Sequence, residues 1–356
     1  MILLPTPAEL VARARADLRL GLPVVIADGA ARIVLASIET VSAARLDEMR
    51  SIGELILCLS GRRAQTLKAR AYDGDVARIV VPSDADLAWM QAVADPADDL
   101  RTPMKGPFKT LRTEGAAVWQ AAVGLAKTAH LLPAVVGASV AGSLDGLTVL
   151  SLNSVQQALV QATTLDRVVG AKLPMAAGRG RLEIFRPDDG GEEHYAVQVG
   201  LPDRAAPVLV RLHSACFTGD VLGSLKCDCG PQLQGALGQM GSEGAGVLLY
   251  LNQEGRGIGL ANKMRAYDLQ DQGFDTVEAN HRLGFEDDER DFRLGAGILR
   301  KMGIKSVRLM TNNPAKIAMM QAQGIEVVER VPLHVGQTAE NADYLAVKAA
   351  KSGHLL

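Results

Sequence analysis

The chain has 356 residues, and its 38 lysines and arginines against 40 aspartates and glutamates give a formal net charge of −2 at pH 7. Hydrophobic residues make up 48% and charged residues 22% of the sequence, which excludes disordered, collagen-like and coiled-coil chains. A chain of this length usually forms more than one core, so we expect two domains. The balanced charge offers no basic tract for nucleic acid or an anionic membrane.

The four cysteines are distributed unevenly. Cys58 stands alone, whereas Cys216, Cys227 and Cys229 fall within fourteen residues. The N-terminus lacks a basic segment followed by a small-residue cleavage site, and no apolar run is long enough to span a membrane. These features predict a cytoplasmic protein, in which clustered thiols more often bind metal or react than form disulfides. We expect Cys58 to be a buried residue of the first domain.

The first half of the chain alternates helical and strand patterns. An amphipathic helix is predicted over 7–20, and buried strands are predicted over 23–27 and 54–58. A long loop over 95–103 and a helix over about 114–130 follow. This alternation predicts an α/β domain.

The stretch 165–180 is predicted to be a linker, because it ends in a run of small residues and glycines. Beyond it, strand and helix patterns alternate again, which predicts a second α/β domain. Strands are expected over 182–186, 195–199, 207–212, 246–251 and 306–310, and helices near 231–241, 260–272, 291–302, 314–323 and 339–351.

Cys216, Cys227 and Cys229 follow a predicted strand, and glycines between them let the backbone fold back so that the three thiols can converge. Structural zinc takes four protein ligands, whereas catalytic zinc keeps one position open for water. Three interpretations follow: a catalytic zinc on three thiolates, a closed zinc with His213 as the fourth ligand, or no metal, with the cysteines acting as small hydrophobic residues or a redox pair.

Three further segments carry charges that suit an anionic ligand. Residues 253–259 form a glycine-rich turn between a predicted strand and a helix. Its backbone N–H groups and Arg256 can hold a phosphate, or the segment is only a tight turn. Residues 311–316 also lie between a predicted strand and a helix, and Lys316 can bind a phosphate there. The alternative is a well-capped helix with a solvated lysine. Residues 286–291 place several carboxylates next to one arginine. Such a run is either a solvated loop or, if buried against a ligand, a site where like charges raise the pKa of a carboxylate that acts as a general base.

Together these segments resemble GTP cyclohydrolase II of riboflavin biosynthesis, and the resemblance covers 171–356. It implies a mixed sheet with flanking helices, GTP as substrate, Zn²⁺ and Mg²⁺ as cofactors, and a homodimer. The implied reaction is hydrolysis of GTP to 2,5-diamino-6-ribosylamino-4(3H)-pyrimidinone 5′-phosphate, formate and diphosphate. The matching segments are 211–220, 224–233, 253–259, 265–273, 275–280, 288–291, 311–316 and 353–356.

The resemblance also implies roles for individual residues. Cys216, Cys227 and Cys229 match the zinc ligands, and a zinc-bound water would attack carbon 8 of guanine. The matching GTP-binding positions are Arg211, Leu212, His213, Ser214, Ala215, Gln232, Glu254, Gly255, Arg256, Thr276, Thr311 and Lys316.

Three positions match residues that act in the reaction. Tyr267 lies near the ring-opening site, Asp288 is the proposed general base, and Arg290 is the proposed nucleophile at the α-phosphorus. We favour a phosphate clamp at Arg290, because a guanidinium keeps its proton at ordinary pH and is a poor nucleophile.

Two positions depart from the family. Members commonly have a glutamate where this chain has Ala215 and an arginine where it has Asn252, so two charges of opposite sign are lost together. The alternative functions are therefore a cyclohydrolase with an altered purine substrate or product, and a non-catalytic, zinc-stabilised nucleotide-binding protein.

Residues 1–165 show a fainter resemblance to 3,4-dihydroxy-2-butanone 4-phosphate synthase, carried by 18–28 and by segments between 113 and 134. The residues for that chemistry are missing. Asp28 is followed by a glycine and alanines instead of acidic and basic residues, and Arg112 replaces a metal-binding histidine. We predict a degenerate, non-catalytic domain that serves as a folded partner or a dimerisation element.

Overall fold

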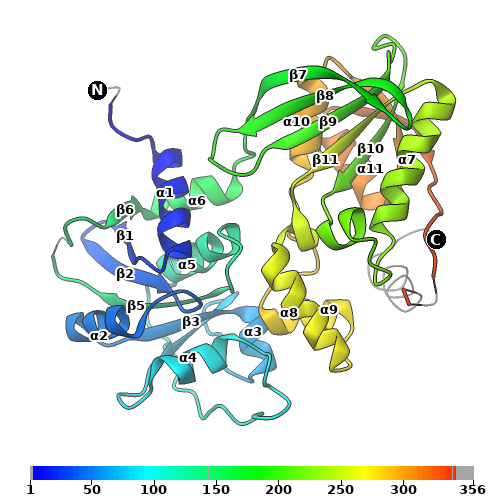
Figure 1. The fold of residues 1–356 in the computed structure, drawn as a ribbon. Helices are drawn as coiled ribbons and strands as arrows, with labels where there is room; N and C mark the ends of the chain where they lie inside the picture. Colours follow the sequence, from blue (N-terminus) through cyan, green and yellow to red (C-terminus); the bar gives the residue numbers. More distant parts are fainter. Residues whose placement is uncertain (1–2, 143, 339, 342–356) are drawn as a thin grey trace. The chain divides into compact units, whose positions relative to one another are not determined.

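The computed structural model describes residues 3–142, 144–338 and 340–341 and divides the chain into two compact units (Figure 1). Unit 1 comprises residues 1–161 and 258–289, and unit 2 comprises residues 162–257 and 290–356. Both are α/β, as the sequence predicts. The helix expected over 339–351 falls, apart from residues 340–341, outside the described residues, as does the matching segment 353–356.

Unit 1 is built on a six-stranded sheet in the order β4-β3-β5-β2-β1-β6. Neighbouring strands are antiparallel except β1 and β6, which are parallel. Every side chain of β3 is buried, as its apolar sequence indicates. The strands are β1 (Val24–Asp28), β2 (Ala31–Ser37), β3 (Ile56–Ser60), β4 (Val76–Val80), β5 (Ala134–Ser139) and β6 (Thr148–Ser151).

Helices cover both faces of this sheet. One core contains α1 (Pro7–Arg19), α5 (Ala116–Thr128) and α6 (Leu152–Val160), and the other contains α2 (Ala43–Ile52), α3 (Gly61–Thr66) and α4 (Leu87–Ala94). Thr6 and Glu9 form a reciprocal capping box that begins α1. The predicted helices, strands and loop of the first half are confirmed, and Cys58 is buried in the first core.

Two helices from later in the sequence also belong to unit 1. They are α8 (Leu260–Asp271) and α9 (Thr276–Leu283), and Asp275 caps the second with a capping box. Their apolar side chains form a separate cluster with Leu132 of the N-terminal region. The members from the later segment are Ile258, Ala266, Leu269, Ala279, Leu283 and Phe285.

Unit 2 contains a seven-stranded mixed sheet in the order β13-β12-β10-β11-β9-β8-β7. The four strands β10 to β13 are parallel to one another, whereas β7, β8 and β9 pair antiparallel. The strands are β7 (Leu165–Met175), β8 (Gly178–Pro187), β9 (His194–Gly200), β10 (Val208–Ser214), β11 (Ala245–Leu251), β12 (Ser306–Met310) and β13 (Glu326–Val331).

Helix α7 (Cys229–Glu243) packs on one face of this sheet, and α10 (Arg293–Lys301) with α11 (Pro314–Ala322) packs on the other. Two short helices, η1 (Phe217–Val221) and η2 (Glu254–Gly257), follow β10 and β11. The mixed sheet with flanking helices is confirmed. Within the described residues, every helix of either unit is too short or too polar to span a bilayer.

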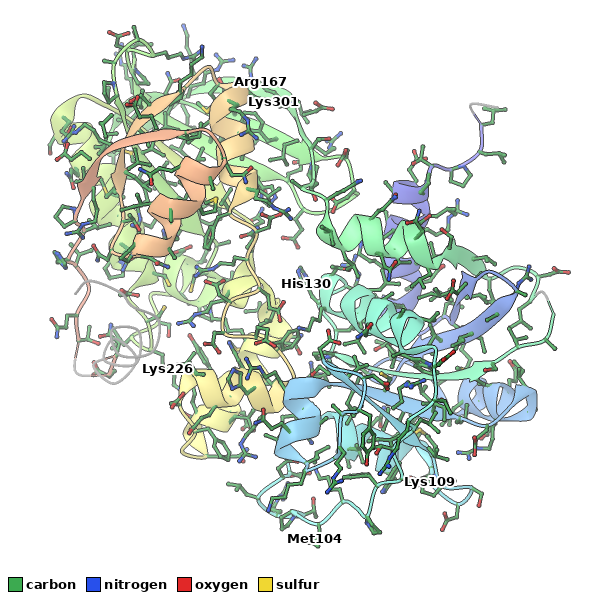
Figure 2. The ribbon with its side chains drawn as sticks, turned by 180° about the vertical axis from the view of Figure 1, so that it is seen from behind. Met104, Lys109, His130, Arg167, Lys226 and Lys301 are labelled. Atoms are coloured by element: carbon green, nitrogen blue, oxygen red, sulfur yellow. The ribbon has the colours of Figure 1, made fainter. Side chains whose placement is uncertain are left out.

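The predicted linker over 165–180 is wrong. Residues 165–175 form β7, the edge strand, which pairs with β8 across a tight turn. Most of its side chains are exposed, so the alternating pattern that marks a half-buried strand is missing, and an edge strand tolerates its proline. Lys301 of α10, labelled in Figure 2, binds Asp166 of β7 at 2.8 Å and joins the hairpin to unit 2.

Candidate functional site

The predicted site residues of unit 2 follow the carboxyl ends of its parallel strands. Ser214 ends β10 and precedes the first cysteine, Glu254 comes three residues after β11, and Thr311 directly follows β12. Parallel strands end at the same edge of a sheet, where α/β proteins usually bind ligands. Segments far apart in the sequence therefore meet at one edge (Figure 1).

The thiols of Cys216, Cys227 and Cys229 lie within 4.8 Å of one another, and the first two Sγ atoms are 3.7 Å apart. Cys216 lies between β10 and η1, whereas Cys229 begins α7. A Cβ atom at Gly219 would lie 2.8 Å from Cys227 Sγ and 3.1 Å from Cys216 Sγ. The glycine is therefore required for the thiols to converge, as its place in the sequence indicates.

The electrostatics of the cluster favour a bound cation. Cys216 most strongly, and then Cys227, raises the pKa of Cys229, and burial adds to the effect. Thiolates this close repel one another unless a metal ion neutralises them, and zinc prefers such sulfur ligands. Among the described residues, these cysteines are the only group of at least three potential ligands of this kind.

His213 is directed to Asp220 rather than belonging to the thiol group. Its Nε2 lies 3.1 Å from both carboxylate oxygens of Asp220, which also accepts hydrogen bonds from the Tyr250 hydroxyl at 2.9 Å and the Cys216 backbone N–H at 3.0 Å. Burial lowers the pKa of His213, with Asp220 acting in the opposite direction. This arrangement counts against the closed zinc site with His213 as fourth ligand.

Asp220 was missed by the sequence analysis as a site residue. It connects His213, Tyr250 and the backbone of Cys216, so it fixes the start of the cysteine segment. The signal was a carboxylate four residues after Cys216, within a segment already rich in candidate residues.

Arg211 provides a buried cation below the strand ends. One of its amino groups donates to the carbonyl of Met310 at 3.1 Å, and the other donates to the Gln232 side chain, which donates in turn to Asp228. Burial lowers the pKa of Arg211 to about 10, against the attraction of Asp228. It therefore stays charged at neutral pH, and its buried Nε has no hydrogen-bond partner.

Arg290 and Lys316 come together at one aromatic ring. The Arg290 guanidinium and the Lys316 ammonium each lie 4.7 Å from the ring centre of Phe292. Arg290 also donates to the Ser214 hydroxyl at 3.3 Å, and Lys316 to the Leu212 carbonyl at 3.2 Å. Two cations held this way form a local positive site that suits a phosphate. The sequence analysis missed Phe292.

The turn after β11 is held in an unusual backbone conformation. Gly255 and Arg256 both have φ of 62°, a region that costs a non-glycine residue about 1 kcal/mol or more. Glu254 accepts from the backbone N–H groups of Phe217 at 2.6 Å and Gly255 at 2.9 Å. Glu254 thereby ties this turn to the cysteine segment. Thr311 is buried and accepts from a backbone N–H at 3.0 Å.

The two positions that depart from the family are neighbours. The Ala215 N–H donates to the Leu251 carbonyl at 2.8 Å, directly before Asn252. The Asn252 side chain donates to the Glu193 carbonyl, and its N–H donates to His194 at 3.0 Å. Burial lowers the pKa of His194 to about 4, so the ring is neutral and can accept that bond. The segments that carry Ala215 and Asn252 are therefore joined by a backbone hydrogen bond.

The remaining predicted residues lie in unit 1. Tyr267 is on α8, Thr276 begins α9, and the exposed Asp288 follows α9. The structure therefore brings together the thiols, the buried arginine and the cations of unit 2, and it places these three residues on the segment 258–289.

Comparison with known proteins shows the family of this chain. The family model described as GTP cyclohydrolase II matches residues 166–332. GTP cyclohydrolase-2 from Azospirillum brasilense is 42% identical over 363 residues, covering 97% of this chain and 93% of the relative. The chain therefore belongs to the GTP cyclohydrolase II family.

Shorter relatives match only part of the chain. GTP cyclohydrolase-2 from Neisseria meningitidis and from Escherichia fergusonii are 54% and 55% identical over 192 residues, which is 54% of this chain and 97% of each relative. A solved two-domain 3,4-dihydroxy-2-butanone 4-phosphate synthase from A. baumannii aligns with 91% of this chain and 99% of its own at 16% identity. Its TM-score of 0.32 supports no inference.

Proposed function

We propose that this protein hydrolyses GTP to 2,5-diamino-6-ribosylamino-4(3H)-pyrimidinone 5′-phosphate, formate and diphosphate, the first step of riboflavin biosynthesis. One observation supports this reaction most directly: three thiols converge at the edge of the sheet where the parallel strands end. The same edge carries the buried Arg211 and the two cations, Arg290 and Lys316, that contact Phe292. Membership of the GTP cyclohydrolase II family supports the same substrate.

We propose Cys216, Cys227 and Cys229 as ligands of one zinc ion, with Mg²⁺ accompanying the triphosphate. When bound there, zinc would supply an activated water for attack on carbon 8 of guanine. Asp220 supports this site by holding the backbone of the first ligand at 3.0 Å.

Cations of the chain would bind the phosphates. Lys316 and Arg290 share the ring of Phe292, and Arg290 acts in our proposal as a clamp that binds the phosphates and keeps its own proton. Glu254 accepts from the backbone N–H groups of Phe217 and Gly255, and a carboxylate can also accept from the guanine N–H groups. The proposed GTP-binding residues are Arg211, Leu212, His213, Ser214, Ala215, Gln232, Glu254, Gly255, Arg256, Thr276, Thr311 and Lys316, with Tyr267, Asp288 and Arg290 as the catalytic residues.

We propose that residues 1–165 are a degenerate synthase-like domain without catalysis of their own and that 171–356 carry the cyclohydrolase. Asp28 ends β1 and pairs with Ala31 across a tight turn of Gly29 and Ala30, which provide no acidic or basic side chain. The Arg112 guanidinium lies 4.3 Å from the ring centre of Tyr72. Formation of butanone phosphate from ribulose 5-phosphate would contradict this assignment. A homodimer and a cytoplasmic location belong to the same proposal.

One assay tests the function. Purified protein is incubated with GTP, Zn²⁺ and Mg²⁺, and formate, diphosphate and the pyrimidine product are quantified over time. We expect formate and diphosphate to be released in step. A retained formyl group would indicate an altered product, and bound nucleotide without turnover would indicate a non-catalytic nucleotide-binding protein.

A further inference from the structure

The segment 258–289 carries three proposed site residues, yet it packs within unit 1 together with the N-terminal region. The relatives from Neisseria meningitidis and Escherichia fergusonii align over 192 residues, which is 54% of this chain.

The backbones of the two regions approach each other at two glycines. A Cβ atom at Gly259 would lie 2.8 Å from His130 Cβ, and one at Gly284 would lie 2.5 Å from Ser60 Oγ. The fully buried Asn262 donates to the His130 carbonyl at 3.0 Å. His130 comes just after α5 and is labelled in Figure 2. Contacts this close define one specific arrangement of the segment on the N-terminal region.

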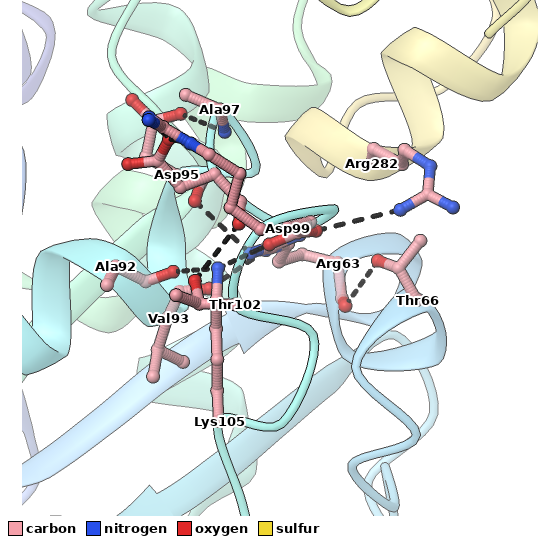
Figure 3. A network of polar contacts seen from close by, with 12 residues as sticks. Arg63, Thr66, Ala92, Val93, Asp95, Ala97, Asp99, Thr102, Lys105 and Arg282 are labelled. Atoms are coloured by element: carbon pink, nitrogen blue, oxygen red, sulfur yellow. Dashed lines mark hydrogen bonds and ion pairs between the residues drawn. The ribbon is translucent and has the colours of Figure 1, made fainter. Parts of the chain in front are cut away.

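Carboxylates of the N-terminal region bind arginines of α8 and α9. Arg265 lies 3.0 Å from Glu39 and 3.3 Å from Asp95, and Arg282 lies 3.6 Å from Asp99. Figure 3 shows Asp99 between Arg282 and other cations of the N-terminal region. Because this carboxylate is nearly buried and held from several sides, Arg282 meets a fixed partner.

After α9, the N-terminal region supplies the cations and the segment supplies the carboxylates. Arg62 lies 2.6 Å from Glu286, and Lys127 lies 2.7 Å from Glu289. The two glutamates lie on either side of Asp288, the proposed general base, so N-terminal cations bind side chains both before and after it. The interface therefore has complementary charges at both ends, and this favours one register of the segment.

We propose that residues 1–161 act as a positioning clamp for the segment 258–289 and so set the placement of Tyr267, Thr276 and Asp288 for GTP hydrolysis. The packing is independent of the proposed function, whereas its effect on catalysis rests on it. Arg62 and Lys127 are positioning residues, because they touch the segment and act on the reaction through Glu286 and Glu289.

The test compares full-length variants by two measurements, amide hydrogen exchange of 276–289 without substrate, and kcat and KM for GTP. In the double variant Arg62→Met with Lys127→Met, we expect exchange to rise about tenfold. We expect kcat to fall about five- to tenfold with little change in KM, because misplaced groups impair the chemical step more than binding.

Two matched variants serve as controls. Arg62→Lys with Lys127→Arg keeps both charges and should restore most of the exchange protection and kcat. Lys109→Met removes an exposed cation elsewhere in the N-terminal region and should leave both measurements unchanged.

The clamp is overturned if exchange in the double variant stays at the wild-type value, or if exchange rises while kcat does not change. Wild-type protein that fails to turn over GTP would instead refute the proposed function. The exchange measurement would still decide whether the N-terminal region holds the segment.

Discussion

The two units use their buried charges differently. In unit 1, the guanidinium of Arg63 is bound by both oxygens of Asp99 and by the Val93 carbonyl. In unit 2, three buried side-chain atoms of the described residues have no hydrogen-bond partner, and two of them, Arg211 Nε and Gln253 Oε1, lie towards or beyond the carboxyl ends of β10 and β11, whereas Ser306 Oγ lies at the start of β12. Buried polar groups normally have hydrogen-bond partners. A buried group whose partners all come from the protein suits a scaffold, whereas one without a partner at a strand edge suits a ligand site.

The largest effect is expected from removing one of the three clustered thiols of unit 2. Cys227→Ser should lose bound zinc and lower formate release at least about a thousandfold, because water without the metal is far less acidic and a much poorer nucleophile at neutral pH. Metal content by mass spectrometry and formate release check this prediction.

Cys58→Ser is the matched control on the scaffold side. Cys58 is fully buried, and burial raises the pKa of its thiol, so a buried hydroxyl there should reduce stability and leave the zinc content unchanged. Full zinc content and activity in Cys227→Ser would show that the thiols do not form the metal site.

The next effect concerns the scaffold itself. Asp99→Ala should destabilise unit 1 by about 3–5 kcal/mol, because it leaves the buried charge of Arg63 without its partner. Denaturant unfolding measures the loss, and Asp98→Ala, which removes a more exposed neighbour paired with the largely exposed Arg101, is the control. Equal stability of the two variants would contradict the scaffold interpretation.

The same carboxylate makes stability depend on pH. Burial alone would raise the pKa of Asp99, but the hydrogen bond and charge of Arg63, followed by those of Lys105, bring it below the ordinary value. A lowered pKa means that the stabilisation is complete above the ordinary aspartate pKa and is lost as pH falls through the folded-state pKa. Wild-type unfolding should therefore become easier on acidification below about pH 4, and Asp99→Ala should lack this component.

The smallest effect is expected at a phosphate contact. Lys316→Met should raise KM for GTP about tenfold and leave zinc content unchanged, because it removes one of the two cations at Phe292. Lys301→Met removes an exposed lysine of unit 2 that binds Asp166 and should leave KM unchanged. An unchanged KM in Lys316→Met would exclude Lys316 as a phosphate ligand.

Elements with strong local signals were predicted from the sequence. The amphipathic pattern of α1 and the apolar run of β3 depend on neighbouring residues alone, and so does the glycine spacing around the cysteines. The edge strand β7 was missed because its exposure is set by its place in the sheet.

The missed site residues have a common cause. Asp220 and Phe292 gain their importance from partners on other strands and loops, such as Tyr250 and Lys316, and a single sequence does not show such contacts. The assignment of 258–289 to unit 1 is likewise a tertiary property, because the segment lies inside the sequence range that matches the cyclohydrolase family.

The packing of 258–289 in unit 1 ties the stability of the later segment to the N-terminal region. Residues 1–161 cover apolar side chains of the later segment, with Leu132 packed in the same cluster as Leu269 and Phe285. Deleting the N-terminal region would expose these side chains to water, at a cost that rises with the apolar area uncovered. The N-terminal region and the later segment therefore share one apolar cluster, so loss of either would leave apolar side chains of the other exposed to water.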